Sequence, residues 1–491
     1  MRKTELVFVP SPGMGHLLST VELAKVIVHR DDRISVVILM FNLPFDLPLV
    51  NAYVESQSRD SDPSRLTFVS LPTLPNPPDP TSNNFFYTLV DLHKPLVKKA
   101  VEDRVGSGSL KPAGFVLDFF CTTLIDVANE LHLPSYIYFT SGASLLNMIF
   151  HFQSLAHDNG IDIATEFDDP DLELDVPGFR NRVPSKVVPG VFFEKDGGSD
   201  MFLNLARRFR QSKGILVNTF IELESYAMQS LLEHDMGKIP AVYPVGPILE
   251  LDNKSRSSSS KKKEDDQESI IRWLDDQPDF SVVFLCFGSM GSFSEDQVKE
   301  IANGLDRAGY RFLWSLRRPA PEGKFGMPSD ETFEDALPEG FMGRTAHLGK
   351  IIGWAPQVSI LAHRAVGGFV SHCGWNSTLE SLWFGIPMAT WPMYAEQQLN
   401  AFELVKEVGL AVEIRMDYRR DRRTKKGNFV ITAEEIENGV KKLMSKDEEM
   451  SEKVREMSEK GKKALEDGGS SHHWLGRFIE DVLDNVNLNS T

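Results

Sequence analysis

The chain has 491 residues, of which 41% are hydrophobic and 25% are charged, and its formal net charge is −17 at neutral pH. This length predicts two domains of roughly 200 to 250 residues, and the composition is that of folded globular proteins, which excludes general disorder. The acidic balance argues against nucleic acid as a partner, because affinity for nucleic acid comes mainly from cations placed on phosphates.

The amino-terminal residues, MRKTELVFVP, lack the long apolar core and the cleavage site of a signal peptide, and they are better explained as a first strand. No run of about 18 or more apolar residues occurs, since even 133–150 is interrupted by polar residues and glycine. The three cysteines include no CxxC pair, which gives neither a disulfide framework nor a zinc site. We therefore expect a soluble protein without a membrane span in a reducing, cytoplasmic compartment.

The first element is an apolar, β-rich run at Leu6–Val9, followed by Pro10-Ser-Pro-Gly-Met-Gly-His16 and then by apolar residues at helical spacing. This pattern predicts His16 at a strand-to-helix corner. A dinucleotide-binding turn is the alternative, but its fingerprint needs a third glycine near Ser19, which is absent. Because the positive end of the helix dipole disfavours a second proton, we expect His16 to have a lowered pKa that suits a neutral base. A structural histidine is the other interpretation.

Further elements of the first half follow from hydrophobic runs and turn residues. A strand is predicted at 34–40, and the Pro-rich stretch from there to about Pro80 is predicted to be loop and short elements. Strands are also predicted at 135–139 and at 214–218, the latter as the last clear strand of the first domain, which ends at 243–247.

A buried strand is predicted at 113–117, and Asp118 follows it directly. Ligands of doubly wound sheets gather beyond the carboxyl ends of the strands, so Asp118 and His16 should face the same cleft. A carboxylate at this place can orient an imidazole. The alternative is that Asp118 is only the N-cap of a helix predicted at 122–131.

The stretch 252–268 is poor in apolar residues and is predicted to be a flexible linker, with a basic partner-binding patch as the alternative. The second domain begins with a strand at 281–287 and a turn at 288–291 that is expected to lead into a helix. Ser289 would then lie at a helix start, where a phosphate can bind. Strands at 312–315 and 350–353 continue the alternation.

The residues after the second sheet are strongly charged. The run 419–426 is predicted to be a solvated loop, 433–467 a pair of amphipathic helices, and 474–486 one further helix.

The stretch from Trp354 to Gln397 carries the densest pattern of the chain. A strand at 367–371 leads through His372 into a helix at 376–384, for which Asn376 or Ser377 is the expected N-cap. The first turn of this helix would place free backbone N–H groups and the positive end of the dipole beside His372. The pattern therefore predicts a phosphate site.

Glu380 lies three residues after Ser377, so a capping box that closes the helix end on itself explains the local pattern equally well. Two features beyond the helix favour a nucleotide. Trp354 and Gln357 offer a flat aromatic face and an amide to a base, and Glu396-Gln397 offers hydrogen bonds to sugar hydroxyls.

Over its whole length this stretch resembles the signature box of plant family 1 UDP-glycosyltransferases. The resemblance implies that Trp354 stacks on uracil, that Gln357 holds the nucleoside and that Glu380 binds both ribose hydroxyls. It assigns the pyrophosphate to His372, Asn376 and Ser377, and the glucose to Trp375, Glu396 and Gln397. The amino-terminal Gly-x-Gly-His and the Asp-Phe-Phe stretch also match the family, which makes His16 the catalytic base and Asp118 its partner. Thr140 corresponds to a residue near the sugar and the β-phosphate.

The resemblance covers essentially the whole chain and implies an α/β GT-B fold, in which two Rossmann-like domains face a central cleft. The expected division is an acceptor-binding domain at 1–250, a linker at 251–269 and a UDP-sugar-binding domain at 270–469. The last helix, at 470–491, is expected to return to the first domain. An acceptor pocket is expected from aromatic residues that are otherwise core: Phe85, Phe86, Phe119 and Phe120.

The expected reaction is an inverting transfer of glucose from UDP-glucose to a hydroxyl of a small lipophilic acceptor. His16 would remove the proton of the acceptor, and helix dipoles and hydrogen bonds would hold the diphosphate, so that no metal or other cofactor is expected. The two Asp-x-Asp matches, at 60–62 and 169–171, follow no strand and are attributed to chance. We expect a monomer.

Two alternatives of other classes stay open at the level of sequence. One is a dehydrogenase, against which the missing third glycine counts. The other is a non-catalytic sugar-nucleotide-binding protein, against which the presence of His16 and Asp118 counts. The acceptor stays open among phenols, flavonoids, terpenoids and plant hormones.

Overall fold

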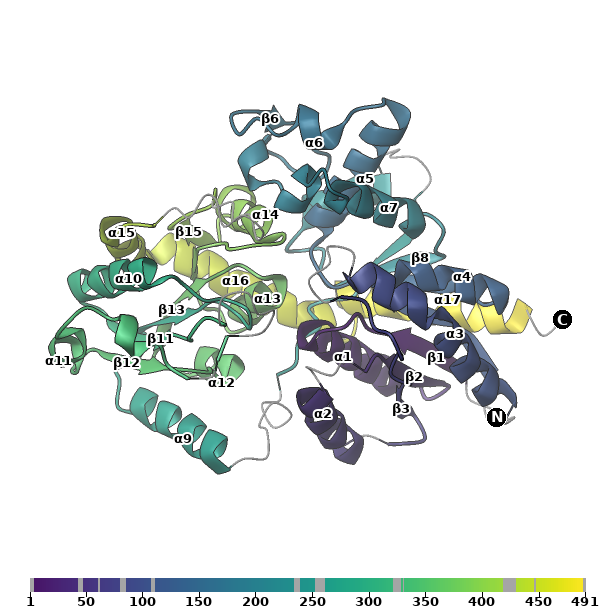
Figure 1. Ribbon diagram of the computed structural model, residues 1–491, viewed down its shortest axis with the longest axis horizontal. Coiled ribbons are helices and arrows are strands. Elements are labelled where there is room, and N and C mark those ends of the chain that lie inside the picture. The colour runs from purple at the N-terminus through teal and green to yellow at the C-terminus, as the bar shows by residue number, and fades with distance from the viewer. Residues whose placement is uncertain are drawn as a thin grey trace.

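The computed structural model describes residues 4–42, 47–60, 62–79, 85–106, 111–233, 239–251, 261–320, 328–329, 331–417, 430–445 and 447–488. Two α/β domains lie side by side, the amino-terminal one in purple to blue and the carboxy-terminal one in green (Figure 1). None of the helices in these ranges is long and apolar enough to cross a membrane.

The amino-terminal domain is built on a parallel sheet of seven strands in the order β3-β2-β1-β4-β5-β8-β9. The strands are β1 Thr4–Val9, β2 Ile34–Met40, β3 Leu66–Ser70, β4 Lys111–Asp118, β5 Ser135–Phe139, β8 Gly214–Val217 and β9 Ala241–Pro244. A separate two-stranded antiparallel sheet consists of β6 Glu173–Leu174 and β7 Val183–Pro184. The helices are α1 Met14–Arg30, α2 Leu47–Asp60, α3 Phe85–Gly106, α4 Ile125–Glu130, α5 Ala143–Asp158, α6 Ile163–Glu166, α7 Gly198–Phe209 and α8 Ser225–Glu233. Short 3-10 turns are η1 Phe119–Leu124, η2 Ser185–Val187 and η3 Gly190–Phe193.

Alternation along the strands gives this sheet two apolar faces. In β1, Val7 and Val9 belong to one hydrophobic cluster, and Leu6 and Phe8 belong to another. The first cluster also contains residues of α3, α4 and α5, and the second contains residues of α1 and α17. Both faces of the sheet are thus covered by helices, which explains the continuous apolar runs in the sequence.

The carboxy-terminal domain has a parallel sheet of six strands in the order β12-β11-β10-β13-β14-β15. The strands are β10 Val282–Cys286, β11 Arg311–Ser315, β12 Gly349–Ile352, β13 Val366–Ser371, β14 Met388–Thr390 and β15 Ala411–Glu413. The helices are α9 Lys261–Asp275, α10 Glu295–Ala308, α11 Phe341–Thr345, α12 Gln357–Leu361, α13 Trp375–Trp383, α14 Gln397–Phe402, α15 Ala433–Met444, α16 Glu448–Leu465 and α17 Ser470–Leu488. A 3-10 turn, η5 Glu334–Ala336, and a π-helical turn, η6 Glu403–Glu407, complete the list.

Local sequence signals set several helix ends in this domain. Ser294 caps α10 by accepting from the backbone N–H of Gln297, and Gly309 ends that helix at φ 70°. Thr432 and Glu435 form a reciprocal capping box at the start of α15.

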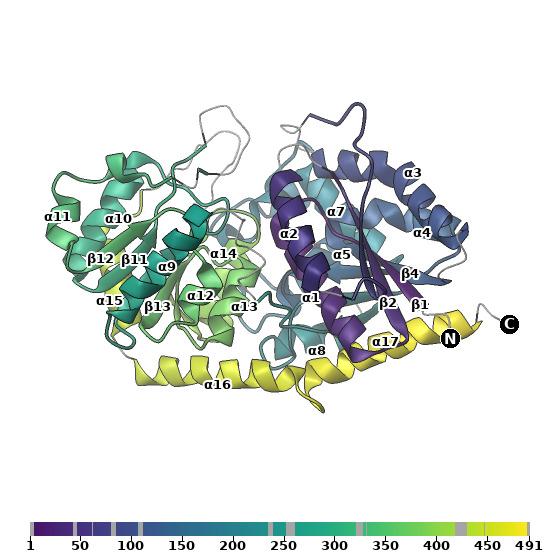
Figure 2. The ribbon, with the colours of Figure 1, turned by 90° about the horizontal axis from the view of Figure 1, so that it is seen from below.

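The last two helices join the domains. α16 runs beneath the carboxy-terminal domain and α17 continues beneath the amino-terminal one (Figure 2). The Tyr136 hydroxyl donates to Asp481 at 2.6 Å, and Lys213 forms an ion pair with the same carboxylate at 2.8 Å. The Phe478 ring packs edge-on to Tyr136. The final helix therefore packs against the first domain.

Four local expectations need correction or limitation. The Pro-rich stretch after β2 contains the 14-residue helix α2 as well as β3. β9 adds a strand beyond 214–218 because it pairs in parallel with β8. Helix α9 begins at Lys261, inside the stretch predicted as a flexible linker, since apolar residues from 270 onward pack its end on the core. Residues 252–260 of that stretch and the charged run 419–426 lie outside the described residues.

Candidate active site

Each parallel sheet has one point at which the strand order reverses, so that the connections after the two adjacent strands run in opposite directions along the sheet. In the first sheet this place lies between β1 and β4, and in the second between β10 and β13. Ligands of doubly wound sheets bind in the crevice beyond such strand ends. His16 follows β1, Asp118 ends β4, and His372 follows β13, so the predicted residues lie at these two positions.

His16 and Asp118 form the predicted pair. The imidazole Nδ1 lies 2.7 Å from Asp118 Oδ2. The Asp118 side chain is fully buried, whereas 29% of the His16 side chain is exposed. Because Nδ1 faces the carboxylate, Nε2 is the ring nitrogen left for a ligand. The geometry is that of a base held in one orientation by a buried acid.

The expected lowering of the His16 pKa is wrong. Burial lowers the pKa, but the charge of Asp118 and the hydrogen bond to it outweigh that effect, and Glu396 raises the pKa further. The net result is a pKa above the ordinary value of a histidine. His16 lies in the first turn of α1, as predicted. A carboxylate in direct contact with an imidazole changes the pKa of that imidazole more than the partial charge of a helix end does.

Asp118 combines two interactions that were treated as alternatives. Its Oδ2 contacts His16, and its Oδ1 accepts from the backbone N–H of Phe120 at 3.0 Å. The second bond caps η1, so the capped element is a 3-10 helix at 119–124 rather than an α-helix at 122–131. The cap fixes the rotation of the carboxylate and so directs the other oxygen at His16.

Aromatic rings lie beside the His16 imidazole. The ring centroids of Phe119 and Phe120 lie 5.8 and 5.7 Å from that of His16. Phe202 continues this wall, 6.2 Å from Phe120. Phe85 is buried, and Phe86 beside it is 42% exposed on α3. The structure gives ring contacts with His16 for Phe119 and Phe120, and no such contact for the other two.

Thr140 lies at the end of β5, and its Oγ1 is 3.5 Å from His16 Nδ1. The parallel pairing of β4 with β5 brings the two strand ends together. This places Thr140 beside the pair formed by His16 and Asp118.

The turn after β13 differs from the expected helix start. α13 begins at Trp375 with Gly374 as its N-cap, so neither Asn376 nor Ser377 caps it. The capping-box interpretation is therefore wrong, because Ser377 lies inside the first turn. Cys373 takes the left-handed conformation at φ 62° and turns the chain sharply between strand and helix. Strained non-glycine residues of this kind cluster at binding sites.

His372 fits a slot between two glycines. A Cβ on Gly288 would lie 2.5 Å from its Nε2, and a Cβ on Gly374 would lie 2.6 Å from it. Burial lowers the pKa of His372 to about 4, so the imidazole is neutral at pH 7. Its Nδ1 is buried without a partner in the described part of the chain, as is Oδ1 of Asn376. The site therefore offers an anion dipoles and hydrogen bonds instead of a positive charge.

Gln357, Ser377 and Glu380 form one hydrogen-bonded group. The Gln357 amide donates to Ser377 Oγ at 2.9 Å and to Glu380 Oε2 at 2.6 Å. Glu380 is buried. Trp354 lies half-buried on the loop after β12, three residues before Gln357 at the start of α12. Gln357 and Glu380, predicted for the nucleoside and the ribose, thus lie together.

Ser289 is placed differently from the prediction. It lies exposed in the turn at 288–290, and α10 begins only at Glu295. Its carbonyl oxygen accepts from Arg317 at 2.7 Å, which holds the turn. The helix that follows is capped by Ser294, five residues further on. Ser289 is still at the strand end next to His372 through the pairing of β10 with β13.

Gln397 is held in one orientation. Its Oε1 accepts from the backbone N–H groups of Met393 and Tyr394 at 2.9 and 3.0 Å, which fixes the orientation of the amide and directs its NH2 group away from these two groups. Glu396 precedes it and follows Ala395, which has φ 55°. Glu396 and His16 influence each other's pKa, so the carboxylate lies close enough to reach the imidazole electrostatically. The two domains therefore contribute to one site.

Some contacts that support the site left no sequence signal. The Trp375 indole N–H donates to the carbonyl of Asn218 in the other domain at 2.7 Å, and Asn400 donates to the carbonyl of Cys373 at 2.9 Å. Both partners are distant in sequence, so only a residue pattern shared among relatives would have indicated them.

In the described ranges, no group of three or more His, Cys, Asp or Glu side chains is arranged to hold a metal ion. Asp169 and Asp171 lie in an exposed turn before β6, away from the strand ends of the large sheets.

Two Rossmann-like domains, with a nucleotide-type site in one and a His-Asp pair in the other, form a GT-B architecture. A sequence profile described as "UDP-glucoronosyl and UDP-glucosyl transferase" matches residues 218–459. The chain is 52% identical to UDP-glucose flavonoid 3-O-glucosyltransferase 6 of Fragaria ananassa, covering 98% of this chain and 99% of that one. It is 52% identical to UDP-glycosyltransferase 71E1 of Stevia rebaudiana, with coverage of 98% and 99%.

Solved structures of similar proteins have the same fold as this chain. A UGT transferase from Siraitia grosvenorii in complex with UDP superposes with a TM-score of 0.87 at 47% identity, covering 98% of this chain and 100% of that one. Medicago truncatula UGT71G1 complexed with UDP-glucose superposes with a TM-score of 0.85 at 41% identity, with 98% of each chain covered. The chain belongs to the plant family 1 UDP-glycosyltransferases, which removes the dehydrogenase alternative.

Proposed function

We propose that this UDP-glycosyltransferase moves glucose from UDP-glucose to a hydroxyl of a small lipophilic acceptor and forms a β-glucoside with inversion. The observation that carries the proposal is the His16–Asp118 pair at 2.7 Å, which faces the nucleotide-type site of the other domain. The similar protein from Fragaria ananassa is named for glucose transfer to flavonoids, and that from Medicago truncatula was solved with UDP-glucose.

In this mechanism His16 is the general base. Asp118 accepts from Nδ1–H, so Nε2 carries the lone pair that takes the proton of the acceptor hydroxyl. As the proton arrives, the buried carboxylate stabilises the imidazolium. The acceptor oxygen then attacks the anomeric carbon from the side opposite to UDP, which inverts the configuration. The wall of Phe119, Phe120 and Phe202 supplies an apolar surface for the acceptor.

The departing UDP is stabilised by the other domain. We assign its diphosphate to the first turn of α13, to the neutral His372 and to Asn376 and Ser377. Helix dipoles and N–H donors take up negative charge without a metal ion, so metal independence is part of the proposal. Thr140, just after β5 of the first domain, is assigned to the sugar and the β-phosphate, and Ser289, after β10, is assigned to the diphosphate.

The nucleoside and the sugar complete the assignment. Trp354 stacks on uracil, Gln357 holds the nucleoside, and Glu380 accepts from the ribose hydroxyls. Trp375, Glu396 and Gln397 bind glucose. The amide of Gln397 suits this task because its oxygen is already satisfied by backbone N–H groups and its NH2 is directed elsewhere.

We propose that the protein is a monomer and that it acts in the cytoplasm. The three cysteines are free and buried, which suits a reducing compartment.

The direct test is release of UDP when the protein is mixed with UDP-glucose and a panel of phenols, flavonoids, terpenoid alcohols and hormones. Product identification by mass spectrometry and NMR then gives the acceptor and the anomeric configuration. UDP release without any glucoside, or an α-linked product, would contradict the proposal. The family alternative, transfer of another UDP-sugar, is tested in the same assay with other donors.

A further inference from the structure

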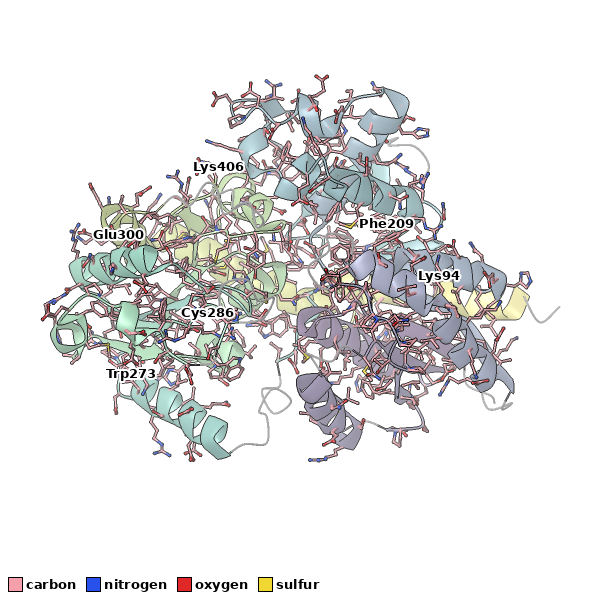
Figure 3. The ribbon with its side chains drawn as sticks, viewed as in Figure 1. Lys94, Phe209, Trp273, Cys286, Glu300 and Lys406 are labelled. Carbon is pink, nitrogen blue, oxygen red and sulfur yellow. The ribbon has the colours of Figure 1, made fainter. Side chains whose placement is uncertain are left out.

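Two buried glutamates meet at the border between the domains. Glu224 lies just before α8 in the amino-terminal domain, and Glu403 opens η6 in the carboxy-terminal one. Their exposed fractions are 3% and 5%. Lys406, on the same turn as Glu403, marks this border in Figure 3, and its carbonyl accepts from Asn181 of the other domain.

Glu224 holds the first turn of α5. Its two carboxylate oxygens accept from the backbone N–H groups of Ala143 at 2.8 Å and Ser144 at 2.7 Å, the first two residues of that helix. A negative charge at this place is stabilised by the N–H donors and by the positive end of the helix dipole. Glu224 therefore acts as an acceptor on both oxygens.

Glu403 needs a proton at this contact. Its Oε1 accepts from Ser144 Oγ at 2.9 Å, and the backbone N–H of the same serine donates to Glu224 Oε1 at 2.7 Å, so the two carboxyl groups meet at one residue. Two buried carboxyl groups at one site repel each other when both are ionised, and a proton on one of them removes this repulsion. Within the described ranges, no Lys, Arg or His forms an ion pair with either group. Burial, followed by the charge of Glu224, raises the pKa of Glu403 well above the ordinary value.

The other groups around Glu403 do not supply a counter-charge. Glu407 on the same turn adds negative charge, and it is bound by the backbone N–H groups of Arg180 and Asn181. Lys406 is exposed, and Glu413 on the neighbouring strand β15 is exposed as well. Lys186 of η2, which packs against α14, pairs instead with Asp417 at 3.8 Å.

The pair also touches a residue assigned to the donor sugar. A Cβ on Gly142 would lie 2.8 Å from a Glu224 oxygen and 2.9 Å from Cη2 of the Trp375 indole, so both groups pack on this glycine. The other end of the indole is held by the carbonyl of Asn218. Gly142 comes two residues after Thr140, which connects the pair to the surroundings of His16.

We propose that Glu224 and Glu403 share one proton across the domain border and act as positioning residues that hold the start of α5 and the Trp375 indole in place for the donor sugar. The proposal rests on the function proposed above, because it concerns the placement of Trp375 in that site.

The two carboxyls should respond differently to the same substitution. In Glu403→Gln the amide oxygen still accepts from Ser144 and the NH2 group replaces the acid O–H as donor to Glu224. In Glu224→Gln an NH2 group must face one backbone N–H of α5, which leaves buried donors opposed. We expect kcat/KM for UDP-glucose to stay within about threefold in Glu403→Gln and to fall about tenfold or more in Glu224→Gln and Glu403→Ala.

A pH series on stability tests the shared proton. The pKa of Glu403 is raised in the folded state, so its protonated form stabilises the fold fully at low pH, and this contribution is lost as pH rises through the folded pKa. Glutamine has no proton to lose. The melting temperature of Glu403→Gln should therefore rise relative to wild type from about pH 5 to about pH 9. Glu413→Gln is the matched control and should show no such trend.

Melting-temperature differences that stay constant with pH would show that Glu403 is ionised in the native protein and would overturn the proposal. Equal loss of kcat/KM in Glu403→Gln and Glu224→Gln would also overturn it. If wild type releases no UDP with any acceptor, the proposed function fails, whereas the melting series on wild type and Glu403→Gln still decides whether the proton is shared.

Discussion

Replacement of His16 tests the assignment of the base. His16→Ala removes the imidazole that Asp118 contacts at 2.7 Å. Loss of a general base lowers the rate by about 10²- to 10⁴-fold, which corresponds to about 3 to 5 kcal/mol in the activation free energy. Affinity for UDP should be nearly unchanged, because the residues assigned to the nucleotide lie in the other domain.

Replacement of Asp118 gives a sharper result because the structure fixes its rotation. Oδ1 accepts from the Phe120 N–H at 3.0 Å. In Asp118→Asn the amide oxygen keeps that bond, so the NH2 group must face Nδ1 of His16. Nδ1 then becomes an acceptor and the proton moves to Nε2, which is the nitrogen needed as base. We expect the rate of Asp118→Asn to approach that of His16→Ala.

The assay is the initial rate with an alcohol acceptor, since an acidic phenol ionises without a base. UDP affinity is measured by calorimetry, and circular dichroism confirms that each variant folds. Asp126→Asn is the matched control, because Asp126 is an ion-paired acid on α4 outside the site. It should keep the wild-type rate.

The double variant completes the test. Groups that act as one unit give losses that do not add, so His16→Ala/Asp118→Asn should be barely slower than the slower single variant. Additive losses would show that Asp118 acts independently of His16, for example only as the cap of η1. A near-normal rate of His16→Ala with an alcohol would remove the base assignment.

Three further results are expected. UDP-glucose should be preferred to UDP-galactose by about 1 to 3 kcal/mol, since Gln397 presents a fixed amide; equal turnover of the two donors speaks against this role. Activity should survive EDTA, and a loss that magnesium or manganese restores would contradict the assignment of the diphosphate to α13. Because Asp118 raises the pKa of His16, the neutral base forms only above the ordinary histidine pKa, so kcat/KM should rise with pH above about 6.5; Asp118→Asn should move this limb to lower pH.

The sequence alone predicted many of the elements, because these depend on local patterns, and it indicated the candidate site residues through local patterns together with the family resemblance. Strands 34–40 and 135–139 were predicted with the observed bounds, since buried parallel strands are continuous apolar runs. Strand-end residues such as His16 and Asp118 were predicted to share a cleft because the carboxyl ends of parallel strands lie at one edge. Helix starts were less certain, and both Ser289 and Ser377 were misplaced because several nearby residues can cap a helix.

The tertiary structure decided the interactions between residues that are far apart in the chain. The pKa of His16 depends on a carboxylate 102 residues away, which reversed the direction expected from the helix dipole alone. The carbonyl that holds the Trp375 indole is 157 residues away, and Glu224 and Glu403 meet only because the two domains do. Such contacts have no period or spacing in the sequence. They follow from how the two sheets are placed against each other, and that placement is set by packing over the whole molecule.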